Sequence, residues 1–213
     1  MQAARGAVVL CGGRSRRMGR PKEWLPFGPE RLLQRAVRLA GAAVDHVVVV
    51  AAEGQDLPEL PGSVRVARDE VADQGPLRGL ATGLAALPDE VELAYLTATD
   101  APFLRDGWVA ALAALADGHD LVIPEADGRL HPAAALYRRG PALVAARARL
   151  AAGRFRLLDV RDVVAARVVP AAALAVVDPG RDTLRNLNTA DDYRRALRDA
   201  GFDPGAGPPG GDG

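Results

Sequence analysis

Short, continuous apolar runs recur along the first part of the chain, and most are followed by glycine or polar residues. Many are rich in β-branched residues and most do not alternate with polar ones, so they predict strands buried on both faces, as in a parallel sheet. Between them, apolar residues recur at helical spacing. The predicted strands cover residues 7–11, 46–51, 64–67, 92–97 and 120–123, and the helical stripes fall within residues 32–40, 80–87 and 109–115. This alternation predicts an α/β fold with right-handed crossovers.

The later part of the chain has a less regular pattern. Its predicted elements are strands at residues 134–137, 168–169 and 175–177 and helices at residues 141–152 and 189–200. Pro141 suits the first turn of its helix, and Gly153 suits the position after its end. Thr189 is the expected N-cap of the last helix, with Asp192 in the place where a capping box prefers Glu or Gln.

The composition narrows the class of protein. Among 213 residues, the 27 basic and 27 acidic side chains cancel, which argues against a generally cationic nucleic-acid binder or membrane-surface protein. The apolar stretches are far shorter than the ~20 residues that a membrane span needs. Cys11 is the only cysteine, so intrachain disulfides and cysteine-cluster metal sites are excluded. We expect a cytoplasmic protein with no nucleic-acid or membrane partner.

The end of the chain differs from the rest. Residues 205–213 are almost entirely Gly, Pro and Asp. Such a segment cannot bury apolar area, and we expect it to be disordered. No internal repeat or linker interrupts the preceding chain, so residues 1–204 are predicted to form a single domain.

The loop after the first predicted strand carries candidate chemistry. It contains Gly12, Gly13 and Gly19, four arginines, and Lys22, the only lysine in the chain. Exposed backbone N–H groups in such a loop can cradle phosphate oxygens, and the cations favour a polyphosphate. Alternatively, these residues form a solvated turn that binds no ligand. The spacing fits neither a Walker A loop nor the dinucleotide-binding fingerprint.

A carboxylate and two amides are further candidates. Asp100 follows an apolar strand and precedes Pro102, so it is expected at the carboxyl edge of the sheet, either holding Mg²⁺ or capping the next helix. Asn186 and Asn188 are two residues apart and would face the same side of an extended segment. They could hold a phosphate, a water or the outer shell of a metal, or they could serve turn formation.

Five segments, in chain order, match family motifs. They are Leu-x-Gly-Gly-x-Ser-x-Arg-Met-Gly-x-x-Lys over residues 10–22, Gly75-Pro76-Leu77-Arg78-Gly79-Leu80, Thr99-Asp100-Ala101-Pro102-Phe103-Leu104, His131-Pro132 before Leu136-Tyr137, and Asn186 to Tyr193. Together they resemble the molybdenum cofactor guanylyltransferases (the MobA family) within the nucleotidyltransferase superfamily. The resemblance implies a Rossmann-like three-layer domain with a mostly parallel central sheet, of the nucleotide-diphospho-sugar transferase type.

The resemblance also implies a reaction. Members transfer GMP from GTP to molybdopterin and release pyrophosphate, with Mg²⁺ as cofactor. GTP, molybdopterin and a molybdoenzyme or cofactor-insertion protein are the implied partners. A related nucleotidyltransferase, such as a cytidylyltransferase acting on molybdopterin or on a sugar or polyol phosphate, is one alternative. A non-catalytic cofactor-binding protein of the same fold is another.

Site residues follow from the matched motifs. The implied catalytic residues are Lys22, Arg17 and Asp100, with Asp100 as the metal ligand. The implied nucleotide-binding residues are Leu10, Cys11, Gly12, Gly13, Lys22, Asp69, Gly79 and Asp100, and the substrate-binding candidates are His131, Asn186 and Asn188. The glycine-rich stretch at 75–79 is expected to be a turn on the nucleoside side of the pocket.

Some of these residues have structural alternatives. Asp69 could be an exposed loop acid, and His131 could be a structural histidine. We interpret Cys11 as a small packing residue because no histidine pairs with it in sequence. Residues 50–52, where some guanylyltransferases carry a nucleotide-contacting Asn, have no amide side chain, which leaves the strictness of GTP over CTP open.

Overall fold

The computed structural model describes residues 4–12, 21–69 and 75–203. Its main sheet has the strand order β10-β7-β9-β6-β1-β4-β5, with β8 paired to β7. Strands β8 and β9 pair antiparallel with their neighbours, and the other pairs are parallel. The strands are β1 (Ala4–Cys11), β4 (His46–Ala52), β5 (Arg65–Asp69), β6 (Val91–Ala98), β7 (Leu121–Ala126), β8 (Arg129–Leu130), β9 (Leu136–Arg138) and β10 (Ala166–Pro170). The predicted α/β class with a mostly parallel sheet is confirmed.

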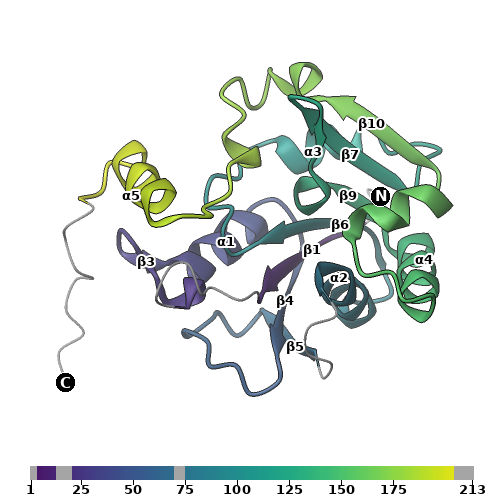
Figure 1. Ribbon diagram of the computed structural model, residues 1–213, viewed down its shortest axis with the longest axis horizontal. Coiled ribbons are helices and arrows are strands. Elements are labelled where there is room, and N and C mark those ends of the chain that lie inside the picture. Colours follow the sequence, from purple (N-terminus) through teal and green to yellow (C-terminus); the bar gives the residue numbers. More distant parts are fainter. Residues whose placement is uncertain (1–3, 13–20, 70–74, 204–213) are drawn as a thin grey trace.

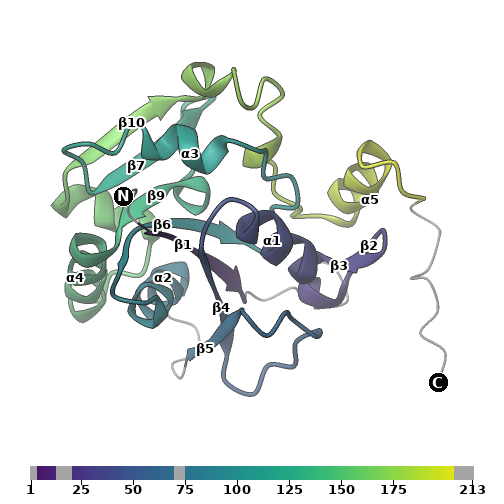
Figure 2. The same cartoon turned by 180° about the vertical axis from the view of Figure 1, so that it is seen from behind.

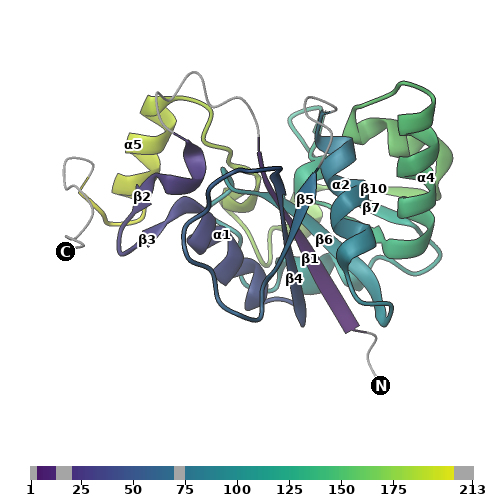
Figure 3. The same cartoon turned by 90° about the horizontal axis from the view of Figure 1, so that it is seen from below.

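Helices cover both faces of this sheet. Helices α2 (Gly75–Ala86) and α4 (Arg139–Ala151) pack on one face, and α1 (Leu32–Gly41) and α3 (Trp108–Ala113) pack on the other (Figures 1 and 3). Successive residues of a strand point to opposite faces. Accordingly, Val8 belongs to the core under α2 and α4, whereas Ala7 and Val9 belong to the core under α1 and α3. The strands are buried on both faces, as the continuous apolar runs predict, and the three layers are those that the family resemblance implies.

Two glycines let α2 approach the central strand closely. A Cβ on Gly83 would lie 2.3 Å from Cγ1 of Val8, and one on Gly79 would lie 2.8 Å from Cδ2 of Leu10. Any larger residue would therefore push the helix off β1. The expectation of a turn at residues 75–79 was wrong, because these residues form the first part of α2. Packing against β1 favours glycine at both positions.

A third, smaller cluster lies beside the main sheet. The hairpin of β2 (Pro26–Phe27) and β3 (Glu30–Arg31) lies next to α5 (Ala190–Asp199), away from α2 and α4 (Figure 2). Phe27 and Leu197 are among its buried residues. Thr189 caps α5 as predicted, since its hydroxyl accepts from the Asp192 N–H at 3.1 Å and Asp192 Oδ2 accepts from the Thr189 N–H at 2.9 Å.

The later elements depart from expectation in one place. Residues 175–177, predicted as a strand, form a turn after the 3₁₀ helix η4 (Ala171–Leu174). The Val177 N–H donates to Leu174 O at 3.1 Å, and the Val176 side chain is 97% exposed. A run of three apolar residues does not make a strand without a neighbouring strand to pair with. The predicted tail at residues 205–213 lies outside the described residues.

Within the described part of the chain, no helix has both the length and the apolar character required to cross a membrane.

Candidate active site

The strand order reverses at β1 in the main sheet. From β1 the chain proceeds to β4 and β5 on one side, and then returns through α2 to β6 on the other side of β1. Ligands of open α/β sheets bind where the strand order reverses in this way. The residues that follow β1 and β6 therefore lie at the place where the fold favours a ligand.

The turn after β6 is tied to the end of β1. Both the backbone N–H and the hydroxyl of Thr99 donate to the carbonyl oxygen of Leu10, at 3.0 and 3.2 Å. The Leu10 carbonyl is therefore engaged within the protein, while its side chain packs against Gly79. These bonds fix Asp100 beside the start of the glycine-rich loop.

Lys22 and Asp100 meet at the carboxyl edge of the sheet. The ammonium Nζ of Lys22 lies 2.8 Å from Oδ2 of Asp100, and the two side chains are 19% and 23% exposed. Lys22 begins the 3₁₀ helix η1 (Lys22–Trp24), which orients its side chain toward β6. The two residues are 78 positions apart in the chain, so the fold, and not local sequence, assembles this pair.

The Asp100 carboxylate suits a Mg²⁺ ion. In the described residues, His, Cys, Asp and Glu form no group of three that could ligate a metal. A single carboxylate that shares an ion with substrate phosphates and water is a common Mg²⁺ arrangement. The donor set therefore fits a metal that arrives with a nucleotide.

The two candidate asparagines lie next to the same turn. The Leu187 N–H donates to the carbonyl oxygen of Asp100 at 2.8 Å. Leu187 is buried, whereas the side chains of Asn186 and Asn188 are more open to solvent, so both amides lie on the side opposite to Leu187, as their spacing predicts. The structure thus brings this segment to Asp100.

Cys11 lies at the end of β1 and is buried. Burial raises the pKa of its thiol to about 12, so the sulfur is protonated at neutral pH. A protonated thiol is a poor nucleophile. This agrees with its interpretation as a packing residue.

Two polar residues near Cys11 were missed in the sequence. The side-chain oxygen of Gln55 accepts from the Ala52 N–H at 3.0 Å, and its Nε2 donates to Cys11 Sγ over 3.7 Å and to the buried carboxylate of Glu23 at 2.5 Å. An amide side chain therefore does reach the end of β4, although residues 50–52 carry none. Nothing in the local sequence indicates that Gln55 folds back.

Asp69 and His131 lie at the same edge, on opposite sides of Asp100. Asp69 ends β5, two strands from β1. His131 precedes β9, which adjoins β6. Burial lowers the pKa of His131, so its imidazole is mostly neutral at pH 7.

The remaining candidates divide between described and undescribed residues. Gly12 is exposed, and no described atom lies within 4 Å of the position that a Cβ would take there. Gly13 and Arg17 lie outside the described residues.

Comparison with known proteins identifies the family. A family model for the MobA-like NTP transferase domain matches residues 7–171. A probable molybdenum cofactor guanylyltransferase from Mycobacterium avium (strain 104) is 38% identical over 196 residues, covering 88% of this chain and 92% of that protein. A protein of the same name from Mycobacterium tuberculosis (strain ATCC 25618 / H37Rv) is 43% identical over 136 residues, covering 62% of this chain and 66% of its own length.

Solved structures agree on the fold. The crystal structure of molybdopterin-guanine dinucleotide biosynthesis protein A from Archaeoglobus fulgidus superimposes with a TM-score of 0.76 at 19% identity, covering 92% of this chain and 98% of that chain. The 2-C-methyl-D-erythritol 4-phosphate cytidylyltransferase from Thermus thermophilus superimposes with a TM-score of 0.68 at 17% identity and the same coverage. The match over residues 7–171, together with the identity to the mycobacterial proteins, shows that this chain belongs to the family of MobA-like NTP transferase domains.

Proposed function

We propose that this protein is a molybdenum cofactor guanylyltransferase, which transfers GMP from GTP to molybdopterin and releases pyrophosphate. A mycobacterial relative that matches most of the chain is named as a probable molybdenum cofactor guanylyltransferase. The observation that supports it most directly is the Lys22–Asp100 pair at the carboxyl ends of β1 and β6. It combines a cation for phosphates with a carboxylate for a metal.

The chemistry is an in-line displacement at phosphorus. An oxygen of the terminal phosphate of molybdopterin forms a bond to the α-phosphorus of GTP. The bond from that phosphorus to the bridging oxygen of the β-phosphate breaks, and pyrophosphate leaves with the electron pair. Such a reaction depends on positioning and on charge neutralisation more than on a covalent nucleophile.

The chain provides these two contributions at its sheet edge. Lys22 and Arg17 neutralise the triphosphate, and the backbone amides of Gly12 and Gly13 bind phosphate or base edges. Asp100 holds Mg²⁺. When bound, this ion shields phosphate charge and stabilises the charge that develops on the leaving group.

We assign GTP and molybdopterin to different parts of the sheet edge, following the order of the candidate residues along it. Asp69 lies two strands from β1, about 10 Å along the sheet by the usual strand spacing, and we assign it to the ribose or base. Gly79 supports that side from α2. His131 lies beyond β6 in the opposite direction, and we assign it, with Asn186 and Asn188, to the pterin substrate. Asp100 lies between the two groups, where the phosphates meet.

Initial rates of pyrophosphate release with molybdopterin test this assignment. We expect GTP to exceed ATP by roughly 10²-fold, since adenine would leave buried polar groups of a guanine pocket unpaired. We also expect GTP to exceed CTP. A kcat/KM for CTP equal to or above that for GTP would make the protein a cytidylyltransferase. Pyrophosphate release with none of the three nucleotides would favour the non-catalytic alternative.

A further inference from the structure

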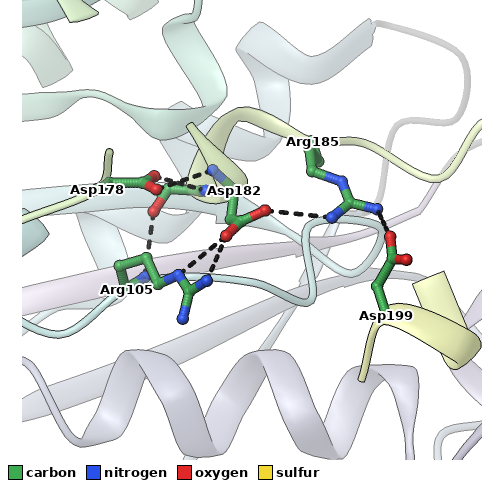
Figure 4. A network of polar contacts seen from close by, with 6 residues as sticks. Arg105, Asp178, Asp182, Arg185 and Asp199 are labelled. Atoms are coloured by element: carbon green, nitrogen blue, oxygen red, sulfur yellow. Dashed lines mark hydrogen bonds and ion pairs between the residues drawn. The ribbon is translucent and has the colours of Figure 1, made fainter. Parts of the chain in front are cut away.

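A chain of alternating charges joins the turn after Asp100 to the segment that precedes Asn186 (Figure 4). The Asp182 carboxylate is at its centre. It accepts from Arg105 through Nε at 3.2 Å and also through Nη2, and it accepts from Arg185 Nη1 at 3.1 Å. On the far side, Arg185 Nη2 lies 2.5 Å from Oδ2 of Asp199 in α5. One carboxylate thus connects two arginines from different parts of the chain.

A buried carboxylate fixes the base of this network. Asp178 is 2% exposed and accepts from the backbone N–H groups of Asp182 and Thr183, at 2.9 and 2.8 Å. The hydroxyl of Thr183 accepts from the backbone N–H of Arg105 at 3.1 Å. Because these bonds involve backbone atoms, they fix the course of both segments and not only their side chains.

The network borders the candidate active site at two points. Arg185 precedes Leu187 by two residues, and the Leu187 N–H donates to the carbonyl oxygen of Asp100 at 2.8 Å. The Arg185 guanidinium also lies over the ring of Phe103, 4.6 Å from its centroid. A shift of Arg185 would therefore reach the Asp100 turn both through the backbone and through Phe103.

The charges of the network are present at neutral pH. The hydrogen bond from Arg105 holds the pKa of Asp182 below its usual value, and the bond from Arg185 acts in the same direction. The facing groups are Arg105, Arg185 and, beyond Arg185, Asp199. The contacts are therefore a constant feature of the folded protein at the pH where a biosynthetic enzyme works.

We propose that Arg105, Asp182 and Arg185 are positioning residues for nucleotidyl transfer, which hold the Asn186–Asn188 segment against Asp100. This inference rests on the proposed function for its kinetic consequence. A role in stability alone would be small, because ion pairs that remain partly open to solvent contribute little. The specific expectation is that loss of the network loosens the bond from Leu187 to Asp100 and slows turnover, while the contacts of GTP with Lys22 and with the residues on the other side of β1 persist.

The test compares Asp182→Asn with a matched control. Asparagine keeps the shape of the side chain and removes the charge that both arginines bind. Asp89→Asn is the control, because Asp89 pairs with Arg139 Nη2 at 2.8 Å, is 98% exposed and precedes β6 at the opposite edge of the sheet. Asp182→Glu, which retains the charge, serves as the rescue variant.

Two readouts are measured on each full-length variant. In Asp182→Asn, we expect the Leu187 amide to exchange its hydrogen about tenfold faster, and kcat to fall about tenfold with KM for GTP within about twofold of the wild type. Asp89→Asn should match the wild type in both readouts, and Asp182→Glu should recover most of each loss.

Unchanged exchange at Leu187 in Asp182→Asn would overturn the inference. Faster exchange with unchanged kcat would also overturn it, since the network would then be only structural. The exchange measurement needs no turnover. A wild-type protein that transfers no nucleotide would therefore reject the proposed function, while exchange at Leu187 still decides whether the network holds this segment.

Discussion

Replacing Lys22 with methionine separates its proposed role in nucleotide binding from its role in stability. Methionine keeps much of the apolar stem and removes the ammonium. In the free protein this group lies 2.8 Å from Asp100 Oδ2, and the two side chains are 19% and 23% exposed. An ion pair with that access to solvent stabilises a fold by about 0–1 kcal/mol. We therefore expect the melting temperature of Lys22→Met to change by only a few degrees at most.

The effect on nucleotide binding should be larger. A charge-assisted contact with phosphate contributes roughly 1.5–3 kcal/mol, which corresponds to about 10- to 140-fold in affinity. The ammonium already has Asp100 as a partner in the free protein, so part of this energy replaces an existing contact. The lower end of the range, about tenfold weaker GTP binding, is therefore the expected result.

Titration of GTP in the presence of Mg²⁺ at fixed ionic strength measures this effect. Arg38→Met is the control, because Arg38 is a 54% exposed cation on α1 that pairs with Glu30 at 2.5 Å. The Arg38→Met variant loses the same net charge away from the Lys22–Asp100 pair and should leave GTP affinity unchanged. Unchanged affinity in Lys22→Met would refute the reasoning and assign the phosphates to the loop arginines. Equal weakening in both variants would indicate an effect of net charge alone.

Three further changes test other parts of the structure. Asp100→Asn is nearly isosteric, so we expect a native melting temperature with nucleotidyl transfer reduced about 10²-fold or more; turnover near that of the wild type would remove the carboxylate from the mechanism. Asp178→Asn replaces one of two acceptor oxygens by a donor at a site that is 2% exposed, which should cost about 1–3 kcal/mol in urea unfolding; an unchanged midpoint would contradict the buried contacts. Burial raises the pKa values of Cys11, Tyr95 and Tyr137, with Cys11 at about 12. In the unfolded chain these groups lose their protons at a lower pH than in the folded protein, so their contribution to stability is complete below the unfolded-chain pKa values and is lost above them. We therefore expect the free energy of unfolding to fall from about pH 9 upward. Constant stability from about pH 8 to 11 would contradict the burial of these groups.

The main sheet could be predicted because burial on both faces leaves a strong sequence signal. Residues 7–11 and 46–51 are continuous apolar runs, and both form interior strands of the sheet, with a neighbouring strand on each side. The β2–β3 hairpin escaped prediction because strands of two residues carry no periodicity. Residues 175–177 were wrongly predicted to be a strand. Their apolar sequence indicates hydrophobicity, but it does not indicate whether another strand lies alongside to pair with them.

The candidate site was predictable in its residues but not in its connections. Asp100 and Lys22 were both singled out, yet their contact depends on the strand order, which places β6 beside β1. Nothing in the sequence indicates the ion pair between Arg105 and Asp182. The chain has 27 basic and 27 acidic residues, and the sequence does not distinguish the two that pair here from ordinary surface charges. Gln55 was missed because its role depends on how a loop folds back.

The turn that carries Asp100 is held by contacts from three separate parts of the fold. Thr99 donates to Leu10 in β1, Leu187 donates to Asp100 itself, and Arg35 of α1 donates through Nε to the carbonyl oxygen of Pro102 at 2.8 Å. All of these bonds end on main-chain oxygens, so they fix the path of the turn and leave the Asp100 carboxylate to Lys22, which in the proposed function gives way to a metal. A displacement at phosphorus depends on fixed charges more than on a reactive side chain. In the proposed function, the contacts that stabilise this edge of the sheet are therefore the same contacts that would prepare it for the reaction.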